Sequence, residues 1–230
     1  MTWSRVGAVD EAAACLLPSW LDPVVAMTRS VHVDAITRFA PDDDAGRHSA
    51  VLILFGDGVD GPDVLIIERA SRMRAHAGQP AFPGGALDPQ DADAEAAALR
   101  EAQEETGLRP QGVLPFGRLP DLYLPVSDFA VTPVLAWWRE PSPVHAAAPA
   151  EVASVHRIPI RTLVDPANRC RARHPSGYSG PAFTVHGLVI WGFTAGLLSA
   201  ILDGAGWSVP WDPDRLVDVA DERDPLEEPA

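Results

Sequence analysis

The chain has 230 residues, of which 47% are hydrophobic; this suits one globular domain with extensions and provides for a buried core. Its formal net charge of −14 argues against a protein that binds nucleic acid or an anionic membrane surface, because both partners need a basic surface. The two cysteines, Cys15 and Cys170, lie far apart, and the N-terminal segment has neither a basic signal region nor a long apolar run. We therefore expect a cytoplasmic protein with free thiols and no membrane span.

Residues 1–45 are expected to form an N-terminal helical extension and a linker. Pro18 and Pro23 interrupt their apolar stretches, and a turn-rich aspartate segment follows. The main domain is predicted over residues 46–205. It opens with two aliphatic runs, residues 50–55 and 64–69, which a glycine-containing turn separates. Such runs favour adjacent strands that are buried on at least one face.

One strong helix is predicted to begin at Asp91 or Asp93 and to end at Thr106. The segment is rich in Ala, Glu and Gln, aspartates stand at its positive end, and Gly107 follows as a stop signal. Further along we expect a nearly apolar helix over residues 191–202, buried against the sheet, and a C-terminal extension with an acidic, proline-containing tail over residues 206–230. Further strands are predicted at residues 113–119, 129–138 and 151–160.

Three glutamates on the first of these helices carry the strongest chemical signal. A helix turns by about 100° per residue, so Glu101, Glu104 and Glu105 share one face, where we expect the carboxylates to converge. A bound cation would relieve their repulsion, and oxygen ligands favour Mg²⁺ or Mn²⁺. Arg100 is placed to orient one carboxylate, and small alanines upstream, such as Ala97, are expected to leave room above the cluster. The alternative is a solvated helix face on which Arg100 pairs with Glu104.

A basic segment and a glycine loop precede the helix. Arg69, Arg72, Arg74 and His76 concentrate positive charge in an otherwise acidic chain, and forked guanidinium donors suit phosphate oxygens. The paired glycines of the following Phe82-Pro83-Gly84-Gly85 allow the backbone to approach a metal or a phosphate closely. The alternative for the basic segment is a surface loop that only balances neighbouring acids.

The helix and its loop resemble the Nudix box, G-x5-E-x7-R-E-U-x-E-E-x-G-U, in which U is a bulky aliphatic residue. The second half matches at every fixed letter over residues 100–108, with Ala102 as an undersized aliphatic. The first half departs: the spacing from Gly85 to Arg100 is one residue longer, and Ala92 occupies the place of the first glutamate. The resemblance implies an α/β fold, a Nudix-type α/β/α sandwich with a mixed β-sheet and a loop–helix–loop catalytic motif.

The longer spacer and the segment upstream of it resemble the coenzyme A pyrophosphatase branch of this family. That branch carries the motif L-L-T-x-R-S-x3-R-x3-G-x-V-x-F-P-G-G. Both arginines, the first glycine and the FPGG are present, as Arg69, Arg74, Gly78 and residues 82–85. Three other positions differ from the motif: Ile67, Ala70 and Pro80. Residues 190–195 also resemble a C-terminal Trp-Gly-x-Thr-Ala motif of the family.

The resemblance implies a role for each group of site residues. Glu101, Glu104, Glu105 and the main-chain carbonyl of Gly84 would hold Mg²⁺ or Mn²⁺. Catalysis would involve Glu101, Glu104, Glu151 and Arg100, with Glu151 or Glu104 as the general base. The residues implied for substrate binding are Arg69, Arg72, Arg74, Gly78, Phe82, Gly84 and Gly85. The reaction would split coenzyme A into 3′,5′-ADP and 4′-phosphopantetheine.

Other interpretations stay open at this point. The substrate is alternatively ADP-ribose, a dinucleotide or another nucleoside diphosphate derivative, since three positions of the upstream motif differ. The chain is alternatively a non-catalytic Nudix-fold module that binds a nucleotide as a regulator. Trp3 and Trp20 would support a homodimer if they face a partner, or pack within the monomer. His156 lies in a strand-like run, where we expect no ligand role.

Overall fold

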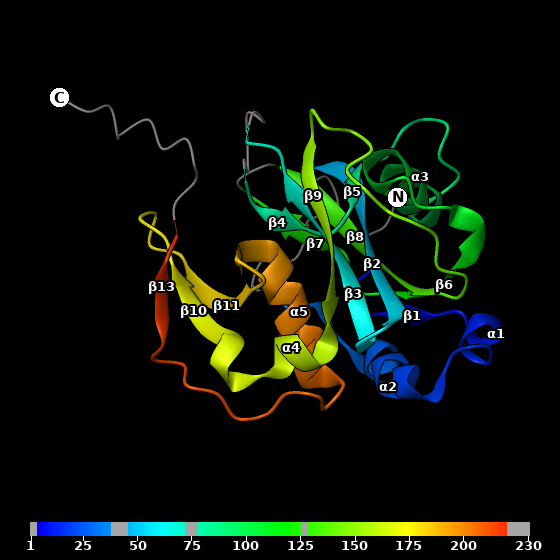
Figure 1. Ribbon diagram of the computed structural model, residues 1–230. Helices are drawn as coiled ribbons and strands as arrows, with labels where there is room; N and C mark the ends of the chain where they lie inside the picture. The colour runs from blue at the N-terminus through cyan, green and yellow to red at the C-terminus, as the bar shows by residue number, and fades with distance from the viewer. Residues whose placement is uncertain (1–3, 38–45, 72–77, 126–127, 220–230) are drawn as a thin grey trace.

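Two β-sheets with helices between and around them make up the protein (Figure 1). The computed structural model describes residues 4–37, 46–71, 78–125 and 128–219. The larger sheet has the strand order β1-β6-β8-β2-β3-β4, with β5 paired to β2, β7 to β8 and β9 to β3. The smaller sheet has the order β12-β11-β10-β13.

The strands of the larger sheet are β1 (Ala8–Val9), β2 (Arg47–Gly58), β3 (Gly61–Arg69), β4 (Pro80–Ala81), β5 (Gly84–Ala86), β6 (Val113–Arg118), β7 (Leu122–Leu124), β8 (Phe129–Trp138) and β9 (Val152–Pro159). The strands of the smaller sheet are β10 (Arg169–Arg173), β11 (Ser179–Val185), β12 (Leu188–Ile190) and β13 (Leu216–Asp218). The α-helices are α1 (Glu11–Ala14), α2 (Asp22–Ser30), α3 (Ala94–Thr106), α4 (Ile160–Val164) and α5 (Gly192–Gly204).

The larger sheet is mixed, as the resemblance implied. β2 and β3 form an antiparallel hairpin, whereas β2 and β8 run parallel over nine residue pairs from Arg47↔Phe129 to Phe55↔Trp137. β2 is buried on both faces, which explains its unbroken aliphatic sequence. Leu52 and Leu54 face one core with α3, and Ile53 and Phe55 face another core.

Helix α3 has the predicted ends and packs closely on the sheet. Asp93 caps its first turn by accepting a hydrogen bond from the Ala96 amide at 2.9 Å, and Gly107 ends it in the left-handed conformation with φ of 69°. Ala97 and Ala98 are fully buried against β2 and β3 residues. The expectation that these alanines leave open space above the glutamates is therefore wrong; their small size lets the helix lie close to the sheet.

Helix α5 is buried, as its apolar sequence predicted, and lies between the two sheets (Figure 1). Leu197 and Ile201 join the same core as Phe55 of the larger sheet and Phe183 of the smaller one. The smaller sheet itself was not predicted.

The N-terminal segment packs on the body of the protein. β1 pairs antiparallel with β6, which adds an edge strand to the larger sheet. Trp20 lies edge-on to Phe55 with ring centroids 6.4 Å apart, and 6.3 Å from the Trp207 ring. Trp20 therefore packs within the monomer, whereas Trp3 lies outside the described residues. The division at residues 45 and 205 and the homodimer stay predictions. No helix in the described ranges is long and apolar enough to cross a membrane.

Candidate active site

Glu105 is the buried centre of the glutamate cluster. The residue is only 3% exposed, and one of its carboxylate oxygens accepts a hydrogen bond from the Gly84 amide at 3.0 Å. Burial raises the pKa of Glu105 to about 7; the Gly84 amide and the charge of Arg69 oppose this shift, and the charges of Glu101 and Glu151 add to it. Burial favours the neutral form because it removes the water that would solvate the charged carboxylate.

Glu101 and Glu104 both form ion pairs with Arg100. Glu101 accepts a hydrogen bond from Arg100 at 2.8 Å, and burial raises its pKa against the effect of that guanidinium. Glu104, with a side chain 59% exposed, lies 3.4 Å from Arg100. The predicted convergence of three carboxylates is not seen: within the part of the chain that the structure describes, no three His, Cys, Asp or Glu side chains are close enough to hold a metal ion. Arg100 and the Gly84 amide hold the glutamates apart.

Asp91 is a site residue that sequence reasoning missed. Its carboxylate receives two hydrogen bonds from Arg100, at 3.1 and 2.9 Å, and its side chain is 6% exposed. These hydrogen bonds lower the pKa of Asp91. Counted six residues forward from Gly85, Asp91 stands where the Nudix box has its first glutamate; counting back from Arg100 gave Ala92 instead. The extra residue of the spacer therefore lies between Asp91 and Arg100.

The paired glycines allow the helix to approach β5. A Cβ atom on Gly85 would lie 2.5 Å from the carboxyl carbon of Glu101, so any side chain there would displace the carboxylate. A Cβ atom on Gly84 would collide with the Ala50 carbonyl of the neighbouring strand β2. Both positions need glycine because backbone and carboxylate approach each other at this point.

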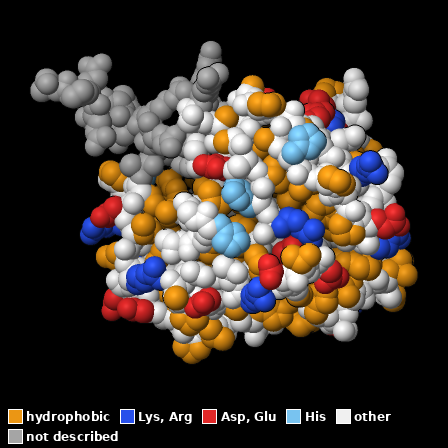
Figure 2. Space-filling view, viewed as in Figure 1, with side chains coloured by type: hydrophobic (Ala, Val, Ile, Leu, Met, Phe, Trp, Pro, Cys, Tyr) orange, Lys and Arg blue, Asp and Glu red, His pale blue; other side chains and the backbone are white. Residues whose placement is uncertain are grey.

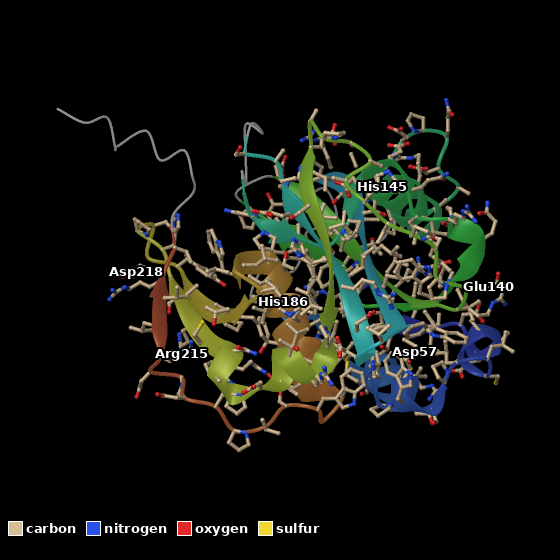
Figure 3. All side chains as sticks on the ribbon, viewed as in Figure 1. Asp57, Glu140, His145, His186, Arg215 and Asp218 are labelled. Carbon is tan, nitrogen blue, oxygen red and sulfur yellow. The ribbon has the colours of Figure 1, made fainter. Side chains whose placement is uncertain are left out.

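Glu151 reaches the glutamates from a separate segment, which hydrogen bonds fix to the end of α3. The amides of His145 and Ala147 donate to the carbonyls of Thr106 and Glu105, each at 3.0 Å, and Figure 3 shows His145 beside α3. The Glu151 carbonyl then accepts from the Ala70 amide at 2.8 Å. Its charge raises the pKa of both Glu101 and Glu105, so Glu151 lies within electrostatic reach of the cluster.

Arg69 supplies the positive charge of the site. It ends β3, where the pairing with β9 shifts register between Glu68 and Arg69, and such bulges often re-aim side chains beside active sites. Its backbone amide and carbonyl bond to Gln79 and Gly78, at 3.1 and 3.0 Å. Its buried Nε has no hydrogen-bond partner among the described residues. A buried guanidinium N–H without a partner is suited to an anionic ligand.

The remaining predicted residues fall into two groups. Phe82 is 2% exposed and its side chain belongs to the core, so only its backbone is left to face a ligand. Arg72, Arg74 and His76 lie outside the described residues.

An acidic helix beside a glycine loop, faced by an arginine, defines a site for hydrolysis at a phosphoric anhydride. A family model described as NUDIX domain matches residues 46–174. The chain belongs to the Nudix family and is a hydrolase that acts on diphosphate bonds.

Two curated relatives are similar over most of their length, and both are named uncharacterized Nudix hydrolase NudL. The one from Citrobacter koseri is 40% identical over 144 residues, which is 60% of this chain and 72% of the relative. The one from Enterobacter sp. is 39% identical over 159 residues, which is 66% and 79% of the two chains.

Solved structures give weaker matches. A Nudix hydrolase from M. smegmatis, RenU, is 22% identical with a TM-score of 0.47, over 70% of this chain and 88% of that one. The NUDIX domain of Shewanella oneidensis NrtR, complexed with ADP ribose, is 18% identical with a TM-score of 0.44, over 58% and 86%.

Proposed function

We propose that this Nudix hydrolase cleaves the diphosphate of coenzyme A or of a coenzyme A derivative. The products would be 3′,5′-ADP and 4′-phosphopantetheine or its acyl form. The observation that carries the proposal is the buried carboxylate of Glu105, whose pKa burial raises to about 7. It lies within electrostatic reach of Glu101, Glu151 and Arg69, and the Nε of Arg69 has no hydrogen-bond partner among the described residues. The glutamates of this site would be stabilised by a bound cation, and Arg69 would be stabilised by a bound anion. A metal-bound diphosphate supplies both.

The donor atoms are of the kind that Mg²⁺ and Mn²⁺ prefer, and a bound cation would draw together the glutamates that Arg100 and the Gly84 amide hold apart. Glu101 and Glu105, joined by Glu104 and the carbonyl of Gly84, provide only oxygen atoms, which hard divalent cations prefer. Burial raises the pKa values of Glu101 and Glu105, so a cation bound beside them would stabilise their charged forms. When bound, the cation neutralises the diphosphate and polarises a phosphorus atom toward attack by water.

The chain's own residues divide the remaining work. Arg69 binds diphosphate oxygens through its guanidinium. Arg100, itself held by Asp91, orients the Glu101 carboxylate. Glu151 accepts the proton of the attacking water, because it lies within electrostatic reach of Glu101 and Glu105, whereas Glu104 is paired with Arg100. Coenzyme A is favoured over other diphosphates by the upstream motif, of which Arg69 and Gly84 act on Glu105 and Gly78 binds the Arg69 backbone.

A cytoplasmic location and a small-molecule partner belong to the same proposal. Cys15 and Cys170 are both free thiols, as the sequence predicted, which is usual in a reducing compartment.

Purified protein with Mg²⁺ or Mn²⁺ tests the proposal. Release of 3′,5′-ADP from coenzyme A should exceed the turnover of ADP-ribose and NADH, and Glu105→Gln should abolish it. Glu140→Gln is the matched control, because Glu140 lies on the surface away from α3 (Figure 3). Equal or faster turnover of ADP-ribose would exclude the coenzyme A assignment and retain the Nudix hydrolase.

A further inference from the structure

A chain of three polar side chains lies directly behind Arg69. Glu68 and Ser154 are cross-strand partners in the β3–β9 pairing. The Ser154 hydroxyl donates a hydrogen bond to the Glu68 carboxylate at 2.6 Å. His156 Nε2 lies 2.6 Å from the Oγ atom of Ser154. A hydroxyl has one proton, which here goes to the carboxylate, so His156 donates its Nε2 proton to Ser154. We name these residues the back-face chain.

The back-face chain and the active site occupy opposite faces of the sheet. Leu65 of β3 and Val155 of β9 pack on the α3 side, whereas Ile66 and Ile158 pack in the other core. Side chains alternate along a strand, so Glu68 follows Ile66 onto the back face. The charge of Arg69 lowers the pKa of Glu105, so Arg69 lies on the side of the sheet that faces α3. Two consecutive residues of opposite charge thus point to opposite faces.

His156 has a further neighbour from the smaller sheet. His186, at the turn between β11 and β12, has φ of 51° and lies within electrostatic reach of His156. Figure 3 shows His186 in the middle of the molecule, and Figure 2 shows histidine side chains near the centre of the face in view. Burial lowers the pKa of His156, with Glu68 opposing and His186 adding to the shift. The neutral imidazole is thus the form that completes the chain at neutral pH.

A shift of β3 by one residue would exchange the two charges. Because the side-chain period of a strand is two, a slip moves every side chain to the opposite face. Glu68 would then add a carboxylate to the face that already holds Glu101, Glu105 and Glu151, and Arg69 would leave it. The register irregularity sits between Glu68 and Arg69, so the ladder between β3 and β9 is already interrupted beside Arg69.

We infer that the back-face chain fixes the register of β3 and so keeps Arg69 directed at the diphosphate. Ser154 and His156 are positioning residues, which act through Arg69 and touch no substrate. This inference rests on the proposed function in that Arg69 binds the substrate's diphosphate.

Ser154→Ala removes the central hydroxyl and tests the inference. We expect KM to rise about tenfold with kcat nearly unchanged, which corresponds to the loss of a charge-assisted hydrogen bond. Ser154→Thr retains a hydroxyl and suits a strand, so it should restore KM. The control is Ser176→Ala, which removes another serine–histidine contact, the 2.7 Å pair Ser176–His174 in the turn between β10 and β11, and should leave KM unchanged.

A double-mutant cycle identifies Arg69 as the residue through which Ser154 acts. Arg69→Ala should raise KM at least as much as Ser154→Ala, and the double variant should be no worse than Arg69→Ala alone. The inference would be overturned if the double variant raised KM by the product of the two single-variant factors. An unchanged KM in Ser154→Ala would also overturn it.

Hydrogen exchange separates this inference from the proposed function. Amide exchange in the peptide around residues 64–70 should be faster in Ser154→Ala than in the wild type and normal in Ser154→Thr. Binding of ADP with Mg²⁺, measured by calorimetry, should weaken in parallel. If the wild type cleaves no diphosphate substrate, the proposed function is wrong. The amide exchange of residues 64–70 and the binding of ADP still test the role of Ser154 in that case. Unchanged exchange and binding would overturn that role even in an active enzyme.

Discussion

Arg100 shows how one cation organises several acids at the scale of single residues. It donates to Asp91, Glu101 and the Ala86 carbonyl at once, at distances of 2.8 to 3.1 Å. The sequence predicts Arg100 as an orienting residue but not its main partner, because the extra residue between Asp91 and Arg100 puts Ala92 at the expected spacing from Arg100. Spacing in sequence locates a partner only when the inserted residue is placed correctly.

Removing the partner of Arg100 should impair catalysis without removing any proposed metal ligand. We expect Asp91→Ala to lower kcat/KM by about tenfold or more, because Arg100 is then free to hold Glu101 away from the cluster. The double variant Asp91→Ala/Ala92→Glu adds a glutamate eight residues before Arg100, where the Nudix box has its first glutamate. This variant should not regain activity. Asp88→Ala, which removes an exposed carboxylate 3.9 Å from Arg100, is the control. Steady-state kinetics measure all three, and rescue by Ala92→Glu would refute the placement of Asp91.

Glu105 should make the metal-free protein less stable as the pH rises. Its folded pKa of about 7 lies above the ordinary value of 4.5, so the folded state holds this proton more tightly than the unfolded state. Stability from this group is complete below the unfolded value and is lost as the pH rises through the folded one. Between about pH 6 and pH 8 the loss is about 1 kcal/mol. Urea unfolding in a metal chelator should show this difference in the wild type and not in Glu105→Gln.

Helix α3 sets the position of the glutamates at the scale of elements. Its buried alanines bring it close to the sheet, and its capping residues fix where it begins and ends. These features are local in sequence, which is why the ends of this helix could be predicted. The strands of the larger sheet were predictable for a similar reason, since their aliphatic runs are long and continuous.

The smaller sheet could not be predicted because its signal is weak. Its inward residues include Cys170, Ala172 and Ala182, which are small, and its strands also contain arginines and glycines. Their packing depends on partners far away in sequence. Arg169 is almost fully buried, with its guanidinium 4.9 Å from the rings of both Phe183 and Trp211. An arginine that is buried by aromatic neighbours cannot be distinguished by pattern from an exposed one.

Enlarging the contact face of α3 should disturb both stability and turnover. Ala98→Leu is expected to destabilise the fold by about 1–3 kcal/mol, because the extra methyl groups find no space between helix and sheet. It should also lower kcat by displacing Glu101 and Glu105 from the glycine loop. Gln103→Leu, on the exposed side of the same helix, should change neither value much. Urea denaturation and kinetics together test this, and an unaffected Ala98→Leu would contradict the close packing.

The chain's N-terminal and C-terminal parts meet at the scale of the whole molecule. Trp20 comes from the N-terminal segment, Trp207 follows α5, and both pack on the core that contains Phe55. Sequence patterns could place neither tryptophan, because the contact joins positions 20 and 207, which lie far apart in the chain. The larger sheet is therefore supported from behind by both of its flanking segments.

Truncating Trp20 should weaken the protein as a whole. Trp20→Ala is expected to lower the free energy of unfolding by about 3 kcal/mol, the usual cost of removing a large packed aromatic ring. KM should stay unchanged, because α3 and Arg69 are on the other face. A single cooperative transition at lower urea concentration supports this; an unchanged midpoint would mean that the N-terminal segment contributes nothing to the core.

The same indole pair also provides an optical signal. Two indoles 6.3 Å apart and inclined at 40° are close enough for their electronic transitions to couple, which gives paired bands of opposite sign in circular dichroism. Trp137 and Trp138 belong to β8 and not to the flanking segments. Loss of the coupled bands with the remaining absorption intact would therefore report when a flanking segment leaves the body of the protein, with no added dye and no substrate.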